Sequence, residues 1–402
     1  MKTRKLTSMI MAMVMVLGLP TTVMAGPNDL GVDISRIYGS TRFDTANKIA
    51  DEFVKSNAEL DLTLEYGDYT YSDCEINKVD TVILANGFNY PDALCSTPLS
   101  KALNAPVLLT HDNNLTPSTA NQIKKMGVKN VVIVGGEGVV TPNVENELKS
   151  MSLNISRLGG IDRYETSYLI AKEVAENIDI EGATVVSGLD WHDALIASPQ
   201  ASIENKPIFL VPIVDNPILP KFKELLESRG LQVRYTNMYG DSEKDLKPEI
   251  LRKMLPACKT EGNDDVDFMT QEGSITNKYA NSFYILDFQY MYALPYSVGE
   301  NVFLTRGDDF ADSLTVAPLA AKMSSPIVFG TTVNKCSKWD EFVDTAETES
   351  IKINYPQTPE GIRVMCNRAL SKMTSSMRGI KLIGGETIVP DNAIDIFKGI
   401  WE

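Results

Sequence analysis

The 402-residue chain has only two histidines, His111 and His192, and neither lies in a His-Glu-x-x-His sequence. This excludes a zinc hydrolase site of that type, which needs two histidines one helical turn apart. A Gly-x-Ser-x-Gly sequence is also missing, so the nucleophile elbow of the serine hydrolases is excluded. We therefore expect neither a catalytic metal nor a cofactor, and we expect His192 at the surface.

Cysteine is scarce, with five residues and no Cys-x-x-Cys pair. An odd number leaves at least one thiol unpaired in an exported chain, and no disulfide framework is indicated. A disulfide between Cys336 and Cys366 is an alternative that the sequence allows. Long apolar runs are also missing, because the run Met9–Leu19 has 11 residues and a membrane span needs roughly 20.

This short apolar run is part of an export signal. Three basic residues precede it, Pro20 ends it, and small residues follow before Gly26. We expect residues 1–25 to be removed, with an uncleaved amphipathic helix as the alternative. No cysteine follows that could carry a lipid and the C-terminus has no sorting tail, so we expect a secreted protein that binding alone would hold on the cell.

Positive charge is in the minority, with 38 Lys and Arg against 53 Asp and Glu, a net charge of −15. Loss of the three basic residues of the signal would make it −18. Nucleic acid is therefore not an expected partner, because binding it requires a basic face. No membrane association is expected after signal cleavage.

An eight-residue sequence occurs three times, at 87–94, 188–195 and 307–314. Its pattern is Gly, any residue, Asn or Asp, an aromatic residue, any residue, Asp, Ala or Ser, and Leu. A proline and an apolar segment follow 14 residues after the aspartate each time, starting at Pro106, Pro207 and Pro326. Such fixed spacing indicates three copies of one structural unit.

Two further elements belong to this unit. Arg-x-x-Gly-x-x-Arg-x-x-Thr occurs at 36–45 and 157–166, whereas the third copy has only Lys278-Tyr279-Ala280-Asn281 at that place. A strand ending in Gly-Gly occurs at 132–136 and 381–385, with a weak counterpart at 238–240. The glycines lack the dinucleotide-binding spacing, so we interpret them as a tight turn with positive φ.

Strands and helices alternate in each copy. The first copy predicts strands at 32–38, 79–85, 107–110 and 131–134, and helices at 42–53, at 91–103 and after Thr116-Pro117 and Thr141-Pro142. Apolar strands alternating with helices are typical of a parallel sheet covered on both faces. Inserts are expected at 55–77 and 335–366. The predicted repeats are 26–151, 152–264 and 265–402.

The repeated aspartates Asp92, Asp193 and Asp312 are expected at helix starts, where a carboxylate satisfies free N–H groups and the helix dipole. Alternatively, each orients an arginine such as Arg42 or Arg163, and arginine binds phosphate or carboxylate in a bidentate fork. The aromatic residue two positions earlier either fills the core or stacks on a sugar. These aromatic residues are Tyr90, Trp191 and Phe310.

Together these motifs resemble the type 2 cell wall-binding repeat of Gram-positive surface proteins. The resemblance implies three Rossmann-like or Toprim-like α/β repeats in a pseudo-threefold arrangement. It also implies non-covalent anchoring, at the cell wall or cell surface of a Gram-positive bacterium, to an anionic wall polysaccharide or teichoic-acid-like polymer. Surface-layer proteins are a further expected partner. The polymer-binding residues it suggests are Arg36, Arg42, Arg157, Arg163, Asp92, Asp193, Asp312, Arg306, Leu108 and Leu109.

The resemblance predicts a binding module and no enzyme. A wall-remodelling hydrolase with its active site in the inserts is the alternative. The acidic composition requires an explanation in either case, because the expected polymer is also anionic. Local arginine clusters or bridging cations would provide one.

Overall fold

The computed structural model describes residues 32–59, 78–232, 236–239, 246–256, 282, 301–330 and 378–394. The predicted export signal, four of the five cysteines, the insert at 335–366 and the insert residues after 59 lie outside these ranges. Cys95 is a free, buried thiol. Within the described part, no helix is both long enough and apolar enough to cross a bilayer.

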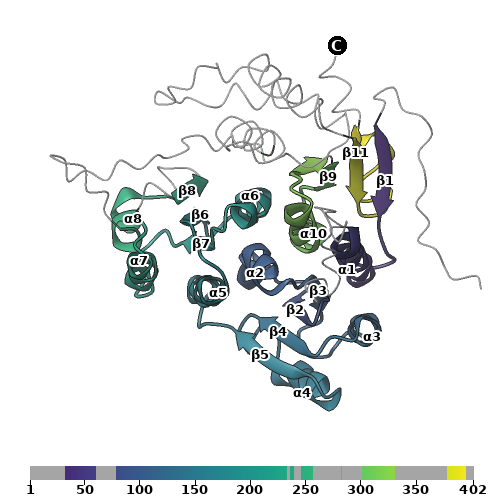
Figure 1. Ribbon diagram of the computed structural model, residues 1–402, viewed down its shortest axis with the longest axis horizontal. Coiled ribbons are helices and arrows are strands. Elements are labelled where there is room, and N and C mark those ends of the chain that lie inside the picture. Colours follow the sequence, from purple (N-terminus) through teal and green to yellow (C-terminus); the bar gives the residue numbers. More distant parts are fainter. Residues whose placement is uncertain are drawn as a thin grey trace, which may run out of the picture.

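The first copy alternates strands and helices as predicted (Figure 1). Its helix α1 runs six residues beyond the predicted end at residue 53 and takes up the start of the predicted insert. The predicted helix at 91–103 divides into a 3₁₀ turn and an α-helix. Its elements are β1 (Asp33–Ile37), α1 (Arg42–Glu59), β2 (Thr81–Asn86), η2 (Pro91–Ala93), α2 (Ser96–Leu103), β3 (Val107–Thr110), α3 (Pro117–Met126), β4 (Asn130–Val134) and α4 (Pro142–Ser150).

The second copy follows the same order, and the described part of the third copy keeps its central elements. The second consists of β5 (Asn154–Leu158), α5 (Arg163–Asn177), β6 (Ala183–Ser187), α6 (Trp191–Ile203), β7 (Ile208–Val211), α7 (Leu219–Ser228), β8 (Thr236–Tyr239) and α8 (Pro248–Met254). The third includes β9 (Asn301–Arg306), α10 (Ala311–Lys322), β10 (Ile327–Gly330), β11 (Gly379–Ile383) and η4 (Asp391–Ile394).

Three parallel sheets are formed, with strand orders β3-β2-β4-β5, β7-β6-β8 and β1-β11-β9-β10. The central strands are buried on both faces, and residues 82–85 of β2 are fully inaccessible. Burying each valine, isoleucine or leucine side chain of this kind contributes about 1.5–3 kcal/mol. The α/β fold class with parallel sheets is therefore confirmed.

The first strand of a copy pairs with a sheet of another copy. β5 pairs with β4, with Arg157 opposite Ile133. β1 pairs with β11, with Arg36 opposite Leu382, so the N-terminal strand completes the third sheet. Figure 1 shows β1 beside β11 at one end of the molecule. The first copy thus contributes β1 to the sheet of the third copy and receives β5 from the second copy.

Helices α2, α6 and α10 pack pairwise against one another at the centre, inside the three sheets (Figure 1). The equivalent aromatic residues of the three copies meet there. Tyr90 lies 5.1 Å from Phe310 and 6.4 Å from Trp191 between ring centroids, and Trp191 lies 5.6 Å from Phe329. Of the two predicted roles of these aromatic residues, the structure supports packing in the core.

His192 differs from its prediction as a surface residue. Its side chain is 15% exposed and stacks on Trp191. Nδ1 contacts the carboxylate of Asp190, and Nε2 lies 2.9 Å from the carbonyl oxygen of Gly307 in the third copy. The prediction failed because the contact that covers His192 comes from another repeat.

Candidate functional site

The Arg-x-x-Gly-x-x-Arg-x-x-Thr sequence forms the turn from a strand into a helix. The hydroxyl of Thr45 accepts a hydrogen bond from the N–H of Gly39 at 3.0 Å. Thr166 accepts one from Gly160 at the same distance. The closed turn places the second arginine as the first residue of α1 or α5.

The first arginine of the motif braces a neighbouring loop. Arg36 is 8% exposed, and its Nη1 donates to the carbonyl oxygens of Gly384 and Val389, both at 2.7 Å. Its Nη2 pairs with Asp391 at 2.6 Å. These contacts hold the loop after β11 against β1, so Arg36 has a structural role.

Arg157 repeats this arrangement in the next copy. Its Nη1 donates to the carbonyl oxygen of Gly135 at 2.9 Å, and its Nη2 pairs with Glu145 at 2.9 Å. Hydrogen bonds from Lys149 and then Arg157 lower the pKa of Glu145. Arg157 therefore braces the loop after β4 as Arg36 braces the loop after β11.

Asp92 lies in η2, directly beneath the Gly-Gly turn of its own copy. Gly135 has φ +114°, and a Cβ there would lie 3.2 Å from Oδ2 of Asp92. Burial raises the pKa of Asp92, while hydrogen bonds from Thr166 and the N–H of Gly136 and the charge of Arg163 oppose the rise. The glycine turn thus admits a carboxylate that faces the second copy.

Asp312 occupies the same position in the first turn of α10. Gly384 has φ +108°, and a Cβ there would lie 2.9 Å from Oδ2 of Asp312. Burial, and then the charge of Asp309, raises its pKa from 3.8 to about 6, against the opposing charges of Arg306 and Arg42. The predicted position at a helix start is confirmed, and each carboxylate also faces an arginine of the next copy.

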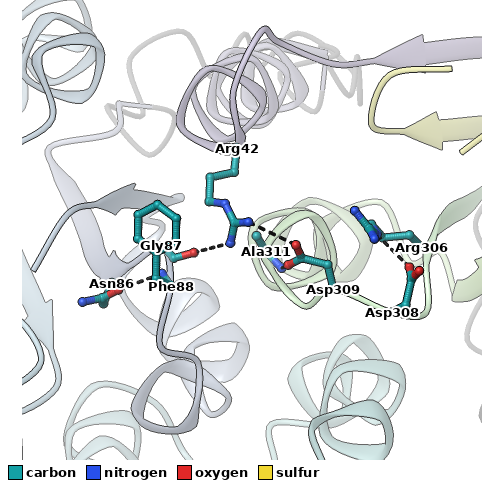
Figure 2. Close-up of polar contacts among 8 residues, drawn as sticks. All are labelled: Arg42, Asn86, Gly87, Phe88, Arg306, Asp308, Asp309 and Ala311. Atoms are coloured by element: carbon teal, nitrogen blue, oxygen red, sulfur yellow. Dashed lines mark hydrogen bonds and ion pairs between the residues drawn. The ribbon is translucent and has the colours of Figure 1, made fainter. Parts of the chain in front are cut away.

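Arg42 lies at the junction of the third and first copies (Figure 2). Its Nη1 donates to the carbonyl oxygen of Gly87 at 2.6 Å, and its Nη2 pairs with Oδ2 of Asp309 at 3.1 Å. The guanidinium carbon lies 4.7 Å from the ring centroid of Phe88. A carbonyl, a carboxylate and an aromatic face therefore surround this cation.

Arg306 lies at the same junction, at the end of β9. Its Nε donates to Oδ1 of Asp308 at 2.7 Å, as Figure 2 shows. This hydrogen bond is the main reason why the pKa of Arg306 is raised. Two arginines and three aspartates are thus gathered at this junction.

Arg163 occupies the corresponding place between the first and second copies. Its Nη1 donates to the carbonyl oxygen of Gly188 at 2.7 Å, as Arg42 donates to Gly87. Among the residues that the structure describes, Arg163 forms no ion pair within 4.0 Å. Its charge acts on Asp92 across the junction.

The remaining predicted residues are less accessible. Leu108 and Leu109 in β3 are fully buried. Side chains so placed cannot touch a polymer in this conformation. Asp193 is 6% exposed in the first turn of α6, and the junction it should face lies largely outside the described residues.

Ser282 of the third copy makes the same backbone contact as Ser167 of the second copy. The N–H of Phe329 donates to Oγ of Ser282 at 3.3 Å, as the N–H of Leu210 donates to Ser167. This register aligns Lys278 with Arg163, in agreement with the sequence pattern, although Lys278 itself is not among the described residues.

The sequence patterns did not single out Asp309, Phe88 or the carbonyl of Gly87 as neighbours of Arg42. Asp309 occupies the Asn or Asp position of the repeated eight-residue sequence. The change between Asn and Asp at this position was the only sign in the sequence that the copies differ there in charge. The partner across the junction cannot be recognised without the arrangement of the repeats.

Comparison with known proteins places this arrangement in a family. A model of cell wall binding domain 2 matches residues 36–145, 157–239 and 275–394, which is most of the chain. The solved structures of Cwp6 and Cwp8 from Clostridium difficile share the fold, with a TM-score of 0.64 each and 22% and 20% identity. They cover 90% and 91% of this chain, which covers 48% and 51% of theirs.

Two Bacillus subtilis proteins are also similar. They are the N-acetylmuramoyl-L-alanine amidase LytC, 29% identical over 175 residues, and an amidase enhancer, 30% identical over 259 residues. The matched parts are 44% and 64% of this chain, but only 30% and 32% of the relatives. Because the family model matches all three repeats, the chain belongs to the cell wall binding domain 2 family.

Proposed function

We propose that the chain is a non-catalytic module that anchors an exported protein to an anionic secondary polymer of the cell wall. The observation that carries the proposal is the equivalent placement of Arg42 and Arg163. Each begins a helix, donates to a glycine carbonyl of its own copy and faces a buried or partly buried aspartate of the preceding copy.

Such an arginine is suited to an anion. A cation at a helix start is unfavourable for the helix dipole, so a residue placed there against local preference is often required for function. The glycine carbonyl fixes one nitrogen of the guanidinium and the nearby aspartate charge attracts it, so the remaining N–H groups can bind a phosphate or carboxylate. Local cations at the junctions would thus allow an acidic chain to bind an anionic polymer.

The proposed surface is narrower than the sequence prediction. It comprises Arg42, Arg163 and Arg306, oriented by Asp92 and Asp312. Asp193 would belong to the third junction. Arg36 and Arg157 support the surface by bracing the loops beneath it, and the buried Leu108 and Leu109 are outside it.

The test is the double variant Arg42→Gln with Arg163→Gln, measured by pull-down on purified cell wall. Losing one charge-assisted hydrogen bond costs roughly 1.5–3 kcal/mol, so affinity should fall about tenfold or more. A double variant of the exposed Arg229 and Arg252 removes the same charge elsewhere and should bind normally. Unchanged pull-down of a folded junction variant, checked by circular dichroism, would remove these arginines from the site.

The hydrolase alternative draws on the amidase-related relatives, which are similar to this chain over about a third of their length. Their names support an association with the wall, and no catalytic constellation was recognised in the sequence. We expect no release of muropeptides from peptidoglycan by the purified mature chain. Release that is lost on mutation of an acidic residue in the first insert, such as Asp61, would establish the hydrolase instead.

A further inference from the structure

The eight-residue sequences at the two described junctions differ at five positions, and one of these differences places a carboxylate directly on an arginine. Three residues before the buried aspartate, the third copy has Asp309 where the first copy has Asn89. Asp309 pairs with Arg42 at 3.1 Å. Arg163 lies at the start of α5 as Arg42 lies at the start of α1, but forms no ion pair or hydrogen bond with Asn89 in the described structure.

The Asp309 carboxylate is held in the position where an external anion would meet the arginine. Its Oδ2 contacts Nη2 of Arg42, while its Oδ1 accepts the N–H of Ala311 at 3.1 Å. Both side chains of the pair are partly covered, with exposed fractions of 28% for Arg42 and 23% for Asp309. An incoming phosphate would have to displace this carboxylate.

The third copy also has Arg306 and Asp308 where the first copy has Asn86 and Phe88, but these two charges pair with each other. An aspartate faces the arginine in each, the buried Asp312 at one and the partly buried Asp92 at the other. Asp162 at the second junction is already engaged, because it accepts hydrogen bonds from the N–H of Glu165 and from Nδ2 of Asn216. The Asp309 carboxylate is therefore the difference between the junctions that directly occupies N–H groups of the helix-start arginine.

We propose that Asp309 is an internal anion that occupies the arginine site between the third and first copies. Of the two junctions, only the one between the first and second copies, with Asn89 and Arg163, then receives an external phosphate or carboxylate group. This inference rests on the proposed function for the identity of the polymer, and it assigns the two junctions unequal roles in binding.

The experiment uses reciprocal variants, Asp309→Asn and Asn89→Asp. Both preserve side-chain size, and the amide oxygen introduced by Asp309→Asn would still accept the N–H of Ala311, so both variants should fold. The first reading is the rate at which phenylglyoxal modifies each arginine, followed by peptide mass spectrometry. A dicarbonyl needs free guanidinium nitrogen atoms, so a paired arginine reacts slowly.

In the natural protein Arg163 should react about tenfold faster than Arg42, which corresponds to about 1.4 kcal/mol. Asp309→Asn should accelerate modification of Arg42, and Asn89→Asp should slow that of Arg163. Equal rates in the natural protein, or no change for Arg42 in Asp309→Asn, would overturn the assignment. Because Phe88 also covers Arg42, the variant comparison isolates the effect of the carboxylate.

The second reading is retention on purified wall. Asn89→Asp should lose most of the binding, whereas Asp309→Asn should keep or increase it. Retention of Asn89→Asp equal to that of the natural protein would overturn the role of this junction. If the natural protein does not bind the wall, the proposed function fails, and the labelling still decides whether Asp309 occupies the site of Arg42.

Discussion

Asp312 makes the stability of the protein depend on pH in a direction unusual for an aspartate. Its pKa is raised from 3.8 to about 6, first by burial and then by the charge of Asp309. The folded state therefore holds the proton more tightly than the unfolded state. Protonation of Asp312 therefore stabilises the folded protein fully below pH 3.8, and this stabilisation is lost as the pH rises through about 6.

The magnitude follows from the two pKa values. A rise from 3.8 to about 6, at about 1.4 kcal/mol for each pKa unit, corresponds to about 3 kcal/mol. The side chain introduced by Asp312→Asn does not titrate. The stability of the natural protein relative to this variant should fall by roughly 2–3 kcal/mol between about pH 4 and about pH 7.

The assay is urea unfolding of both proteins at several pH values, followed by circular dichroism. All other titrating groups are common to the two proteins, so their contributions cancel in the difference. Asp309→Asn should reduce the effect, because it removes a charge that raises the pKa of Asp312. A constant difference across this pH range would refute the interpretation of Asp312 as a carboxylate destabilised by its site.

Two further pairs of variants test the supports of the site. Arg36→Ala should lower the unfolding free energy by roughly 3 kcal/mol, because it leaves two buried carbonyl oxygens without donors. Arg157 is more exposed, so Arg157→Ala should lower the unfolding free energy less. Equal shifts of the melting temperature in the two variants would contradict this order. Gly384→Ala should cost roughly 1–3 kcal/mol through its positive φ and the nearby Asp312, whereas Gly138→Ala, with open space around it, should leave the melting temperature unchanged.

Local patterns predicted the elements of the fold well. Thr116-Pro117 and Thr141-Pro142 mark the starts of α3 and α4, with proline in the first turn as expected. The constant 14-residue spacing aligned the three aspartates. These features depend on neighbours close in sequence, so the sequence alone was sufficient. The repeat boundaries at 151/152 and 264/265 remain predictions.

Contacts between repeats were not predicted. Nothing local shows that β1 pairs with β11, because a parallel strand can reach any sheet that its connection allows. The pairing of Arg42 with Asp309 joins residues 267 positions apart. The prediction that His192 lies at the surface was wrong for the same reason. The candidate site lies at the junctions, so the sequence indicated its arginines and aspartates but not their partners.

The proposal that a wall polymer binds at the junctions of the repeats can be tested by hydrogen exchange. The mature chain would be measured by mass spectrometry with and without purified wall polymer. We predict slower exchange in the segments 87–93 and 159–166, with little change in α4 and α7 at the rim of the molecule (Figure 1). Slower exchange confined to α4 or α7, with the junction segments unchanged, would contradict binding at the junctions.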